Sequence, residues 1–190
     1  MPEEWPQQIH AWHDFYAITG TAAATLTGLM FVVVSLGPRT IARSSGTGVR
    51  AFVTPTVVHF ATVLFVAALM AIPATTPVLA ESALLVGGVA LLAYLNWTRV
   101  HRQWRESNLD RDDWLWYVGL PGLSYLLLVA GALGIWERSE LGLASVAAAV
   151  LTLVATGIRN SWDLVIFMSQ RAHGDDAEDH DDGGDRQHER

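Results

Sequence analysis

The sequence contains no cysteine and no lysine, and charged residues make up only 16% of its 190 residues. Without cysteine, the chain can form neither a disulfide framework nor a thiolate-ligated metal site. An ordinary soluble domain has about a quarter charged residues, so a chain with so few charges and 51% hydrophobic residues is typical of a membrane protein.

Sequence motifs of enzymes are missing as well. The chain has no HExxH pair, no nucleophile elbow, no GxxxxGK phosphate loop and no dinucleotide fingerprint. Its arginines fall on segments between apolar runs, which indicates topology and contact with anionic lipid rather than nucleic-acid binding. The sequence therefore predicts no enzymatic activity, no cofactor and no nucleic-acid partner.

Acidic charge is concentrated at the C-terminal end. Residues 174–190, GDDAEDHDDGGDRQHER, hold eight acids and two arginines. Such a segment has almost nothing apolar to bury, so nothing offsets the entropy lost on ordering it. We therefore expect residues 1–173 to form a transmembrane helical bundle and residues 174–190 to form an acidic, disordered cytoplasmic tail.

Five apolar runs approach or exceed the length that crosses a bilayer, which takes about 20 residues of α-helix. Prolines mark their borders. Thr54-Pro55 and Thr76-Pro77 each place a capping hydroxyl before a proline at a first helical position, and Pro73 ends the second run. The pattern predicts an all-α bundle of five transmembrane helices, at residues 15–36, 55–72, 77–100, 114–136 and 140–170.

Arginine distribution predicts the orientation of this bundle. One side of the membrane receives most of the arginines: Arg39, Arg43, Arg50, Arg99, Arg102, Arg105, Arg111 and Arg171. The other side has only Arg138, so the positive-inside rule puts the N-terminus outside and the C-terminus in the cytoplasm. Tryptophans, which prefer the membrane interfaces, then fall into an outer group (Trp5, Trp12, Trp136) and an inner group (Trp97, Trp104, Trp114, Trp116, Trp162).

Two of the predicted helices have a face of small, hydroxylated and charged residues. On the fifth helix this face consists of Ser145, Ala149, Thr152, Thr156, Arg159 and Asp163. On the first helix it consists of His10, Asp14, Ala17, Thr21, Thr25, Gly28 and Ser35, and Gly20, Ala24 and Gly28 add a small-xxx-small pattern. Such faces allow helices to pack closely, and the same residues also suit a hydrated or ion-conducting path.

The charged pair of the fifth helix has two interpretations. Arg159 and Asp163 are i, i+4 partners, and Arg159 lies about 28 Å along the helix from Glu140 at 1.5 Å per residue. At that depth the pair fits the inner membrane interface, where the arginine side chain can extend toward the headgroups. However, the apolar residues 164–168 follow the pair, and if the bilayer boundary falls after them the pair is buried in the bundle.

A polar layer near the cytoplasmic face is a further hypothesis. By depth, His59, Asn96, Arg159, Asn160 and Asp163 fall at similar levels of their helices. Ionisable residues within a membrane point to function by default. Mutual satisfaction of buried polar groups, as a structural clamp, is the alternative.

The N-terminal stretch IHAWHDFY offers a weak candidate metal site. His10, His13 and Asp14 lie within one turn of each other, and Glu81 begins the third helix on the same side. Histidine and carboxylate are zinc ligands. The same residues are also ordinary at a membrane interface, where Glu81 complements a helix dipole, and the histidines suit a proton-sensitive site.

Two stretches, WHDFYAITGTAAATLTGLMFVVVSL at 12–36 and GIRNSWDLVIFM at 157–168, resemble a family of small bacterial multi-pass membrane proteins. That family has a WHDFY-type opening and an RNxWD-type element in its last helix. The resemblance implies a bacterial inner membrane and carries over no activity and no functional residue.

Together these patterns predict a homo-oligomeric ion channel or channel-like permeation protein of the bacterial inner membrane. The polar-path candidates are Asp14, Thr21, Thr25, His59, Asn96, Thr152, Thr156, Arg159, Asn160 and Asp163. Because a chain this small encloses little room alone, a path is expected between protomers around a symmetry axis. The main alternative is a non-transporting accessory or scaffold protein whose polar faces only pack helices. A third class is an intramembrane enzyme that uses His59 or the outer group of His10, His13 and Asp14.

Overall fold

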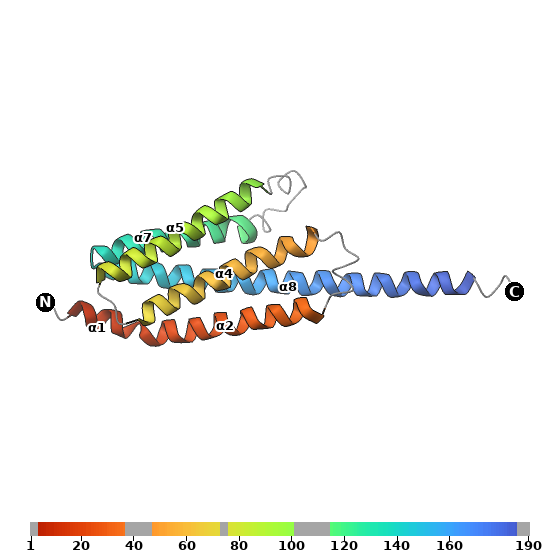
Figure 1. Ribbon diagram of the computed structural model, residues 1–190, viewed down its shortest axis with the longest axis horizontal. Helices are drawn as coiled ribbons and strands as arrows, with labels where there is room; N and C mark the ends of the chain where they lie inside the picture. The colour runs from red at the N-terminus through yellow and green to blue at the C-terminus, as the bar shows by residue number, and fades with distance from the viewer. Residues whose placement is uncertain (1–3, 37–46, 73–75, 101–114, 186–190) are drawn as a thin grey trace.

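The structure is a computed structural model that describes residues 4–36, 47–72, 76–100 and 115–185. These residues form helices and turns, with no β-strand among them (Figure 1). Arg39, Arg43, Arg102, Arg105, Arg111, Trp104 and Trp114, which entered the predictions above, lie outside the described residues. The helices are α1 (Glu4–Ala11), α2 (His13–Leu36), α4 (Thr47–Ala71), α5 (Thr76–Val100), the π-helix η2 (Leu115–Gly119), α7 (Leu120–Trp136) and α8 (Glu140–Asp185).

Successive long helices run in alternating directions, because short connections return the chain along its own length. The N-terminus and the α4–α5 and α7–α8 connections lie at one end of the bundle (Figure 1). The opposite end holds the end of α2, the start of α4, the end of α5 and η2, and α8 continues beyond it. The described helix ends therefore fall into two groups, one at each end of the bundle.

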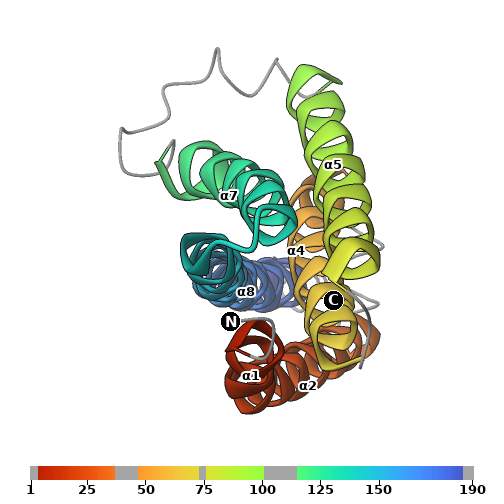
Figure 2. The same ribbon diagram turned by 90° about the vertical axis from the view of Figure 1, so that its left-hand side faces the viewer.

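Helix α8 is the centre of the bundle and packs against both α4 and α7. Helix α2 packs mainly against α4, and α5 packs mainly against α7 (Figure 2). The core between them contains Tyr16, Phe60, Tyr125, Leu128, Ile135, Leu143, Leu153 and Leu164, all almost fully buried. Helix α2 consequently lies at the edge of the bundle with one side free.

Four helices are long and apolar enough to cross a membrane: Trp5–Ser35, Val78–Asn96, Leu115–Trp136 and Glu140–Ile166. The apolar part of α4, Pro55–Ala71, is shorter. Large apolar side chains cover the outside, including Ile18, Leu85, Leu92 and Leu141, each at least two-thirds exposed. Exposure on this scale is costly in water and normal in lipid, so the fold is that of a helical membrane protein.

The predicted starts of the first two helices differ from the structure. A short helix, α1, precedes α2 and ends in a turn at Trp12, and the Gln8 amide on α1 donates a hydrogen bond to Glu140 Oε1 at 2.5 Å. Helix α4 begins at Thr47, so Pro55 lies inside it rather than at its first position. Proline removes one backbone donor there, and the packing of α4 between α2 and α8 outweighs that loss.

The last helix continues further than predicted. Residues 174–185 are part of α8, whereas the sequence indicated a disordered tail from Gly174, and residues 186–190 lie outside the described part. Extending an existing helix requires no new nucleus and fixes one residue at a time for one hydrogen bond. The packed helix before it therefore supplies the nucleus that an isolated acidic segment lacks.

Candidate functional site

The polar face of the first long helix points away from the bundle. We define the α2 polar face as Asp14, Ala17, Thr21, Thr25, Gly28 and Ser35, all of which are exposed. The Asp14 side chain is 97% exposed, and a Cβ added to Gly28 would have no neighbour within 4 Å. By contrast, Gly20 lies on the inner side, where an added Cβ would be 2.9 Å from Ala67 of α4.

Each hydroxyl of this face donates a hydrogen bond to a backbone carbonyl in the preceding turn of α2. Thr21 Oγ1 donates to the Ala17 carbonyl at 2.8 Å, Thr25 Oγ1 to the Thr21 carbonyl at 2.9 Å and Ser35 Oγ to the Phe31 carbonyl at 2.7 Å. A hydroxyl that donates in this way keeps acceptor lone pairs for another partner. The α2 polar face therefore presents a row of oxygen acceptors with a carboxylate at one end.

The corresponding face of α8 lies inside the bundle. Ala149 and Thr156 are fully buried, and Thr152 is half-buried. Ser145 Oγ donates to the Leu127 carbonyl of α7 at 2.9 Å, while Thr152 and Thr156 bond to carbonyls of their own helix. Within one protomer the α8 residues thus make a helix contact, and they do not face the α2 polar face.

The α7–α8 contact brings two helix backbones close together. At Gly142, an added Cβ would be 2.5 Å from the carbonyl carbon of Gly134 and 2.6 Å from the nitrogen of Ile135. Only a residue without a side chain allows this approach of two backbones. The crossing fixes the position of α8, and hence of Arg159 and Asp163 further along it.

Arg159 and Asp163 lie at the end of the bundle that holds η2. Their exposure is intermediate between the two predictions, an interfacial pair and a buried pair. Their side chains are 42% and 26% exposed, and Arg159 Nε is 4.0 Å from Asp163 Oδ2. The guanidinium carbon lies 5.2 Å from the ring centroid of Trp116, while Tyr117 Oη donates to Asp163 Oδ2 at 2.5 Å. The pair is therefore a loose ion pair in which each member has an aromatic partner from η2.

The π-helix η2 places Trp116 and Tyr117 against α8. Pro121, the second residue after η2, has no N–H, so it cannot donate a hydrogen bond to the carbonyls of Trp116 or Tyr117. Tyr94 Oη of α5 donates to the Val118 carbonyl at 2.6 Å and lies 3.5 Å from the Tyr117 carbonyl. The wide turn is thus held by α5 on one side and by α8 on the other, and such turns are frequent at functional sites.

His59 has a different partner from those predicted. Its Nδ1 lies 2.7 Å from the hydroxyl of Tyr125 on α7, and both side chains are almost fully buried. The ring of Tyr94 lies 5.5 Å from that of Tyr125, between centroids. A buried hydrogen bond between His59 and Tyr125 therefore joins α4 to α7, in keeping with the need of buried tyrosine and histidine side chains for a polar partner.

The predicted five-residue polar layer does not form as one group. Asn96 is exposed on α5, His59 pairs with Tyr125, and Arg159 and Asp163 meet η2. Asn160 is 2% exposed, and its Oδ1 has no hydrogen-bond partner among the described residues. The prediction rested on depth along each helix, and the direction of each side chain around its helix axis separates these residues.

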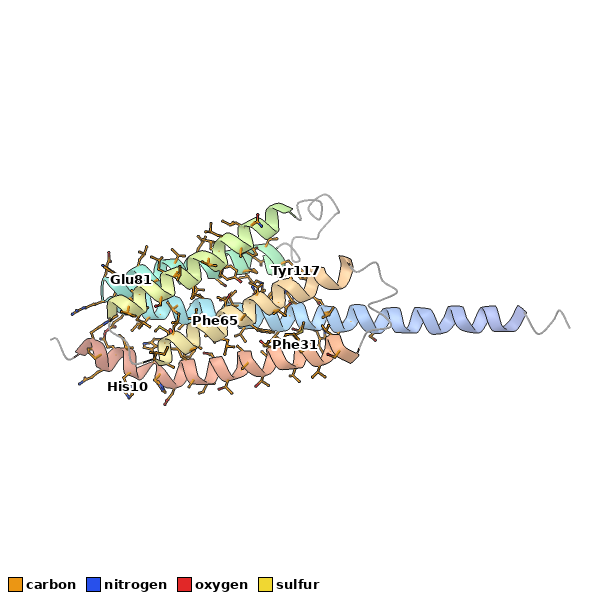
Figure 3. The ribbon with its side chains drawn as sticks, in the orientation of Figure 1. His10, Phe31, Phe65, Glu81 and Tyr117 are labelled. Carbon is orange, nitrogen blue, oxygen red and sulfur yellow. The ribbon has the colours of Figure 1, made fainter. Side chains whose placement is uncertain are left out.

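The predicted metal site is also wrong as a group. His10, His13 and Asp14 are all exposed, with His13 Nδ1 3.5 Å from Asp14 Oδ1 and the two imidazole centroids 6.0 Å apart. Figure 3 shows His10 and Glu81 on opposite sides of the bundle. No three histidine or acidic side chains of the described residues are placed to hold a metal ion. The turn at Trp12 interrupts the helix on which His10 and Asp14 were expected to share a face.

Four aromatic residues of this region were not predicted as site residues: Tyr94, Trp116, Tyr117 and Tyr125. The sequence does contain a signal for two of them. Tyr94 and Tyr125 stand within apolar runs, and a tyrosine hydroxyl buried in such a run needs a partner from another helix. This signal indicates that a partner exists and gives no information on which helix supplies it.

Comparison with known proteins adds no relative, since no family model, curated protein or solved structure matches the chain. The class of the protein, a helical membrane protein, therefore follows from its own helices and exposed apolar surface.

Proposed function

We propose that this protein is a homo-oligomeric, channel-like permeation protein of a bacterial inner membrane, with the α2 polar face lining the path between protomers. The observation that carries the proposal is the outward position of that face on a helix long and apolar enough to cross the membrane. Polar groups facing lipid are unfavourable, so hydroxyl and carboxylate groups on the outside of α2 favour a partner or water over acyl chains.

The small residues of α2 support assembly through this face. Ala17, Ala24 and Gly28 are exposed and allow another helix to approach closely. Helix α2 lies at the edge of the bundle, so copies arranged around a symmetry axis can bring their α2 helices together without rearranging the protomer (Figure 2). A path formed in this way requires no internal cavity in one small chain.

The chemistry of the face favours cations. Thr21, Thr25 and Ser35 keep oxygen lone pairs, and hydroxyl and carbonyl oxygens replace the hydration shell of a cation. Asp14 adds a fully exposed carboxylate at one end. The described part of α2 carries no arginine, so no fixed positive charge of that helix opposes a cation in the path.

The proposed orientation has the N-terminus outside and the C-terminus in the cytoplasm. The distribution of arginines supports it. Arg138 lies on the α7–α8 turn, at the end of the bundle where the N-terminus lies, and it is the single arginine of the segments at that end. Many arginines fall in the sequence segments between helices whose ends lie at the opposite end. Labelling of a cysteine introduced in place of Ser139 by a membrane-impermeant thiol reagent in intact cells tests this orientation, and protection of that cysteine contradicts it.

The alternative is a non-transporting accessory protein. One observation favours it: the α2 hydroxyl protons already have backbone acceptors, so this face is compatible with a dry contact to another helix. The two functions therefore differ in whether the assembled α2 helices enclose water.

Cation flux into liposomes containing the purified protein distinguishes the two functions. Flux through the wild type is expected, and a Thr21→Val, Thr25→Val variant is expected to lose about tenfold or more, since each lost oxygen contact in a desolvated path is worth about 1 kcal/mol or more. Thr27→Val is the matched control, because Thr27 makes the same backbone hydrogen bond at 2.8 Å from a half-buried position on another side of α2.

Oligomer mass in the same preparation completes the test. A wild-type oligomer without flux would leave the accessory function as the better description. Equal loss of flux in the Thr27→Val control would show that the effect comes from helix packing rather than from the α2 polar face.

A further inference from the structure

Arg159 has hydrogen-bonding capacity that its neighbours do not use. A guanidinium offers five N–H donors, yet the nearest carboxylate atom is 4.0 Å from Nε, beyond the length of a hydrogen bond. The other contact is the Trp116 ring, 5.2 Å away, which accepts no conventional hydrogen bond. Among the described residues, no group accepts a hydrogen bond from the two terminal nitrogens of Arg159.

The carboxylate that would normally pair with this arginine is held by another group. Tyr117 Oη donates a 2.5 Å hydrogen bond to Asp163 Oδ2, the same oxygen that lies closest to Arg159. The hydrogen bond from a hydroxyl stabilises the negative charge of the carboxylate, so the carboxylate depends less on the guanidinium for charge compensation. The cation–π contact with Trp116 meanwhile restrains the position of the guanidinium, so the arginine is held in place without being neutralised.

The surroundings of Arg159 match the headgroup level of a membrane. Trp162, one turn along α8, is 66% exposed, and exposed indoles prefer the interface between acyl chains and water. Arg159 lies about 28 Å along α8 from Glu140, close to the thickness of the hydrocarbon core, about 30 Å. The apolar span of α8 ends a few residues later, at Ile166, and an arginine side chain this close to the end of a span can extend its guanidinium to the level of the lipid phosphates.

We propose that Arg159, oriented by Trp116 and flanked by Trp162, is a binding site for the phosphate group of an anionic phospholipid. A planar guanidinium matches two oxygens of a phosphodiester, which a lysine ammonium cannot do in the same geometry. Anionic lipid is favoured over a zwitterionic one because the described cluster pairs Arg159 only loosely and leaves its positive charge largely uncompensated. This site is independent of the permeation path, since it lies on α8 and η2 and not on the α2 polar face.

Native mass spectrometry of the full-length protein with added lipid tests the site. Wild type is expected to retain more phosphatidylglycerol than phosphatidylcholine. Arg159→Gln is expected to lower phosphatidylglycerol occupancy about tenfold, the factor for one or two charge-assisted hydrogen bonds. Arg138→Gln is the matched control, because Arg138 is an exposed arginine at the opposite end of the bundle and should leave occupancy unchanged.

Two further variants separate lipid binding from folding. Arg159→Lys keeps the charge but not the planar fork, and Trp116→Leu keeps the arginine but removes the aromatic ring of the cation–π contact; each is expected to give intermediate occupancy in a folded protein. If both bind phosphatidylglycerol as tightly as wild type, or if Arg159→Gln does so, the proposal is wrong. The same holds if Arg138→Gln loses as much lipid.

Soluble phosphate is the remaining source of the same chemistry. Millimolar inorganic phosphate or glycerol 3-phosphate should leave bound phosphatidylglycerol in place, because the lipid also holds on through its acyl chains. Displacement of the lipid by either soluble ion would assign the site to free phosphate and overturn the lipid assignment.

Discussion

Gly142→Ala is expected to lower the free energy of unfolding by about 2–3 kcal/mol, because an added methyl group overpacks the α7–α8 crossing. The new Cβ would be 2.5 Å from the Gly134 carbonyl carbon and 2.6 Å from the Ile135 nitrogen, which are backbone atoms that cannot rotate away. Relief requires separation of α7 from α8, the helix at the centre of the bundle. Denaturant unfolding in detergent, followed by circular dichroism, measures the loss.

Gly88→Ala on α5 is the matched control for this prediction. A Cβ at Gly88 would meet nothing within 4 Å, so the substitution adds helix propensity of up to about 1 kcal/mol without overpacking. We expect this variant to be as stable as wild type or slightly more so. Equal stability of the Gly142 and Gly88 variants would show that the two helices do not approach as closely as described.

The His59–Tyr125 hydrogen bond is expected to give the second large effect. His59→Leu leaves the Tyr125 hydroxyl buried without its 2.7 Å partner, and Tyr125→Phe does the same to His59 Nδ1. Each single change should cost about 1–3 kcal/mol, whereas removing both partners avoids the unpaired group. The double variant should therefore be more stable than the sum of the single changes predicts.

A double-mutant cycle from the same unfolding measurements tests this coupling. We expect an interaction energy of about 1–2 kcal/mol between the two positions. Strict additivity would mean that His59 and Tyr125 do not depend on each other, and the buried connection between α4 and α7 would then have to come from other contacts.

The sequence predicted the helices because the signal for them is local. Apolar length determines which segments suit a membrane, so the third and fourth predicted helices agree with the structure to within one residue at the ends that it describes. The start of α4 and the extent of α8 could not be predicted in the same way. Pro55 and Gly174 are helix breakers by local chemistry, but neighbouring helical residues and packing outweigh that preference.

The candidate site was only partly predictable because its contacts are between helices. The periodicity of Thr21 and Thr25 correctly placed them on one face of a helix, and the same holds for Thr152 and Thr156. However, periodicity does not say whether a face points inward, and the structure puts the first pair outside and Thr156 inside. Only the packing order of the helices decides this.

The aromatic partners of Arg159 and Asp163 could not be predicted from the sequence for the same reason, because they come from another helix. Arg159 and Asp163 were recognised as i, i+4 partners, but their contacts with Trp116 and Tyr117 depend on a π-helical turn before Pro121. A sequence containing Pro121-Gly122 indicates an irregularity near that point. It does not specify a π-turn, nor which side chains that turn directs toward α8.

Thiol modification at a single site on α2 tests the proposed permeation path most directly. The native chain has no cysteine, so a Thr25→Cys variant carries a unique thiol on the α2 polar face, and Val89→Cys carries one on the exposed apolar surface of α5. Cation flux into liposomes is measured before and after addition of a charged, water-soluble thiol reagent. A path lined by α2 predicts that the reagent blocks flux through the Thr25→Cys protein and leaves the Val89→Cys and wild-type proteins unchanged. Flux that persists after the Thr25→Cys thiol has been modified, or a thiol there that never reacts because it faces lipid or a dry contact, would contradict that path.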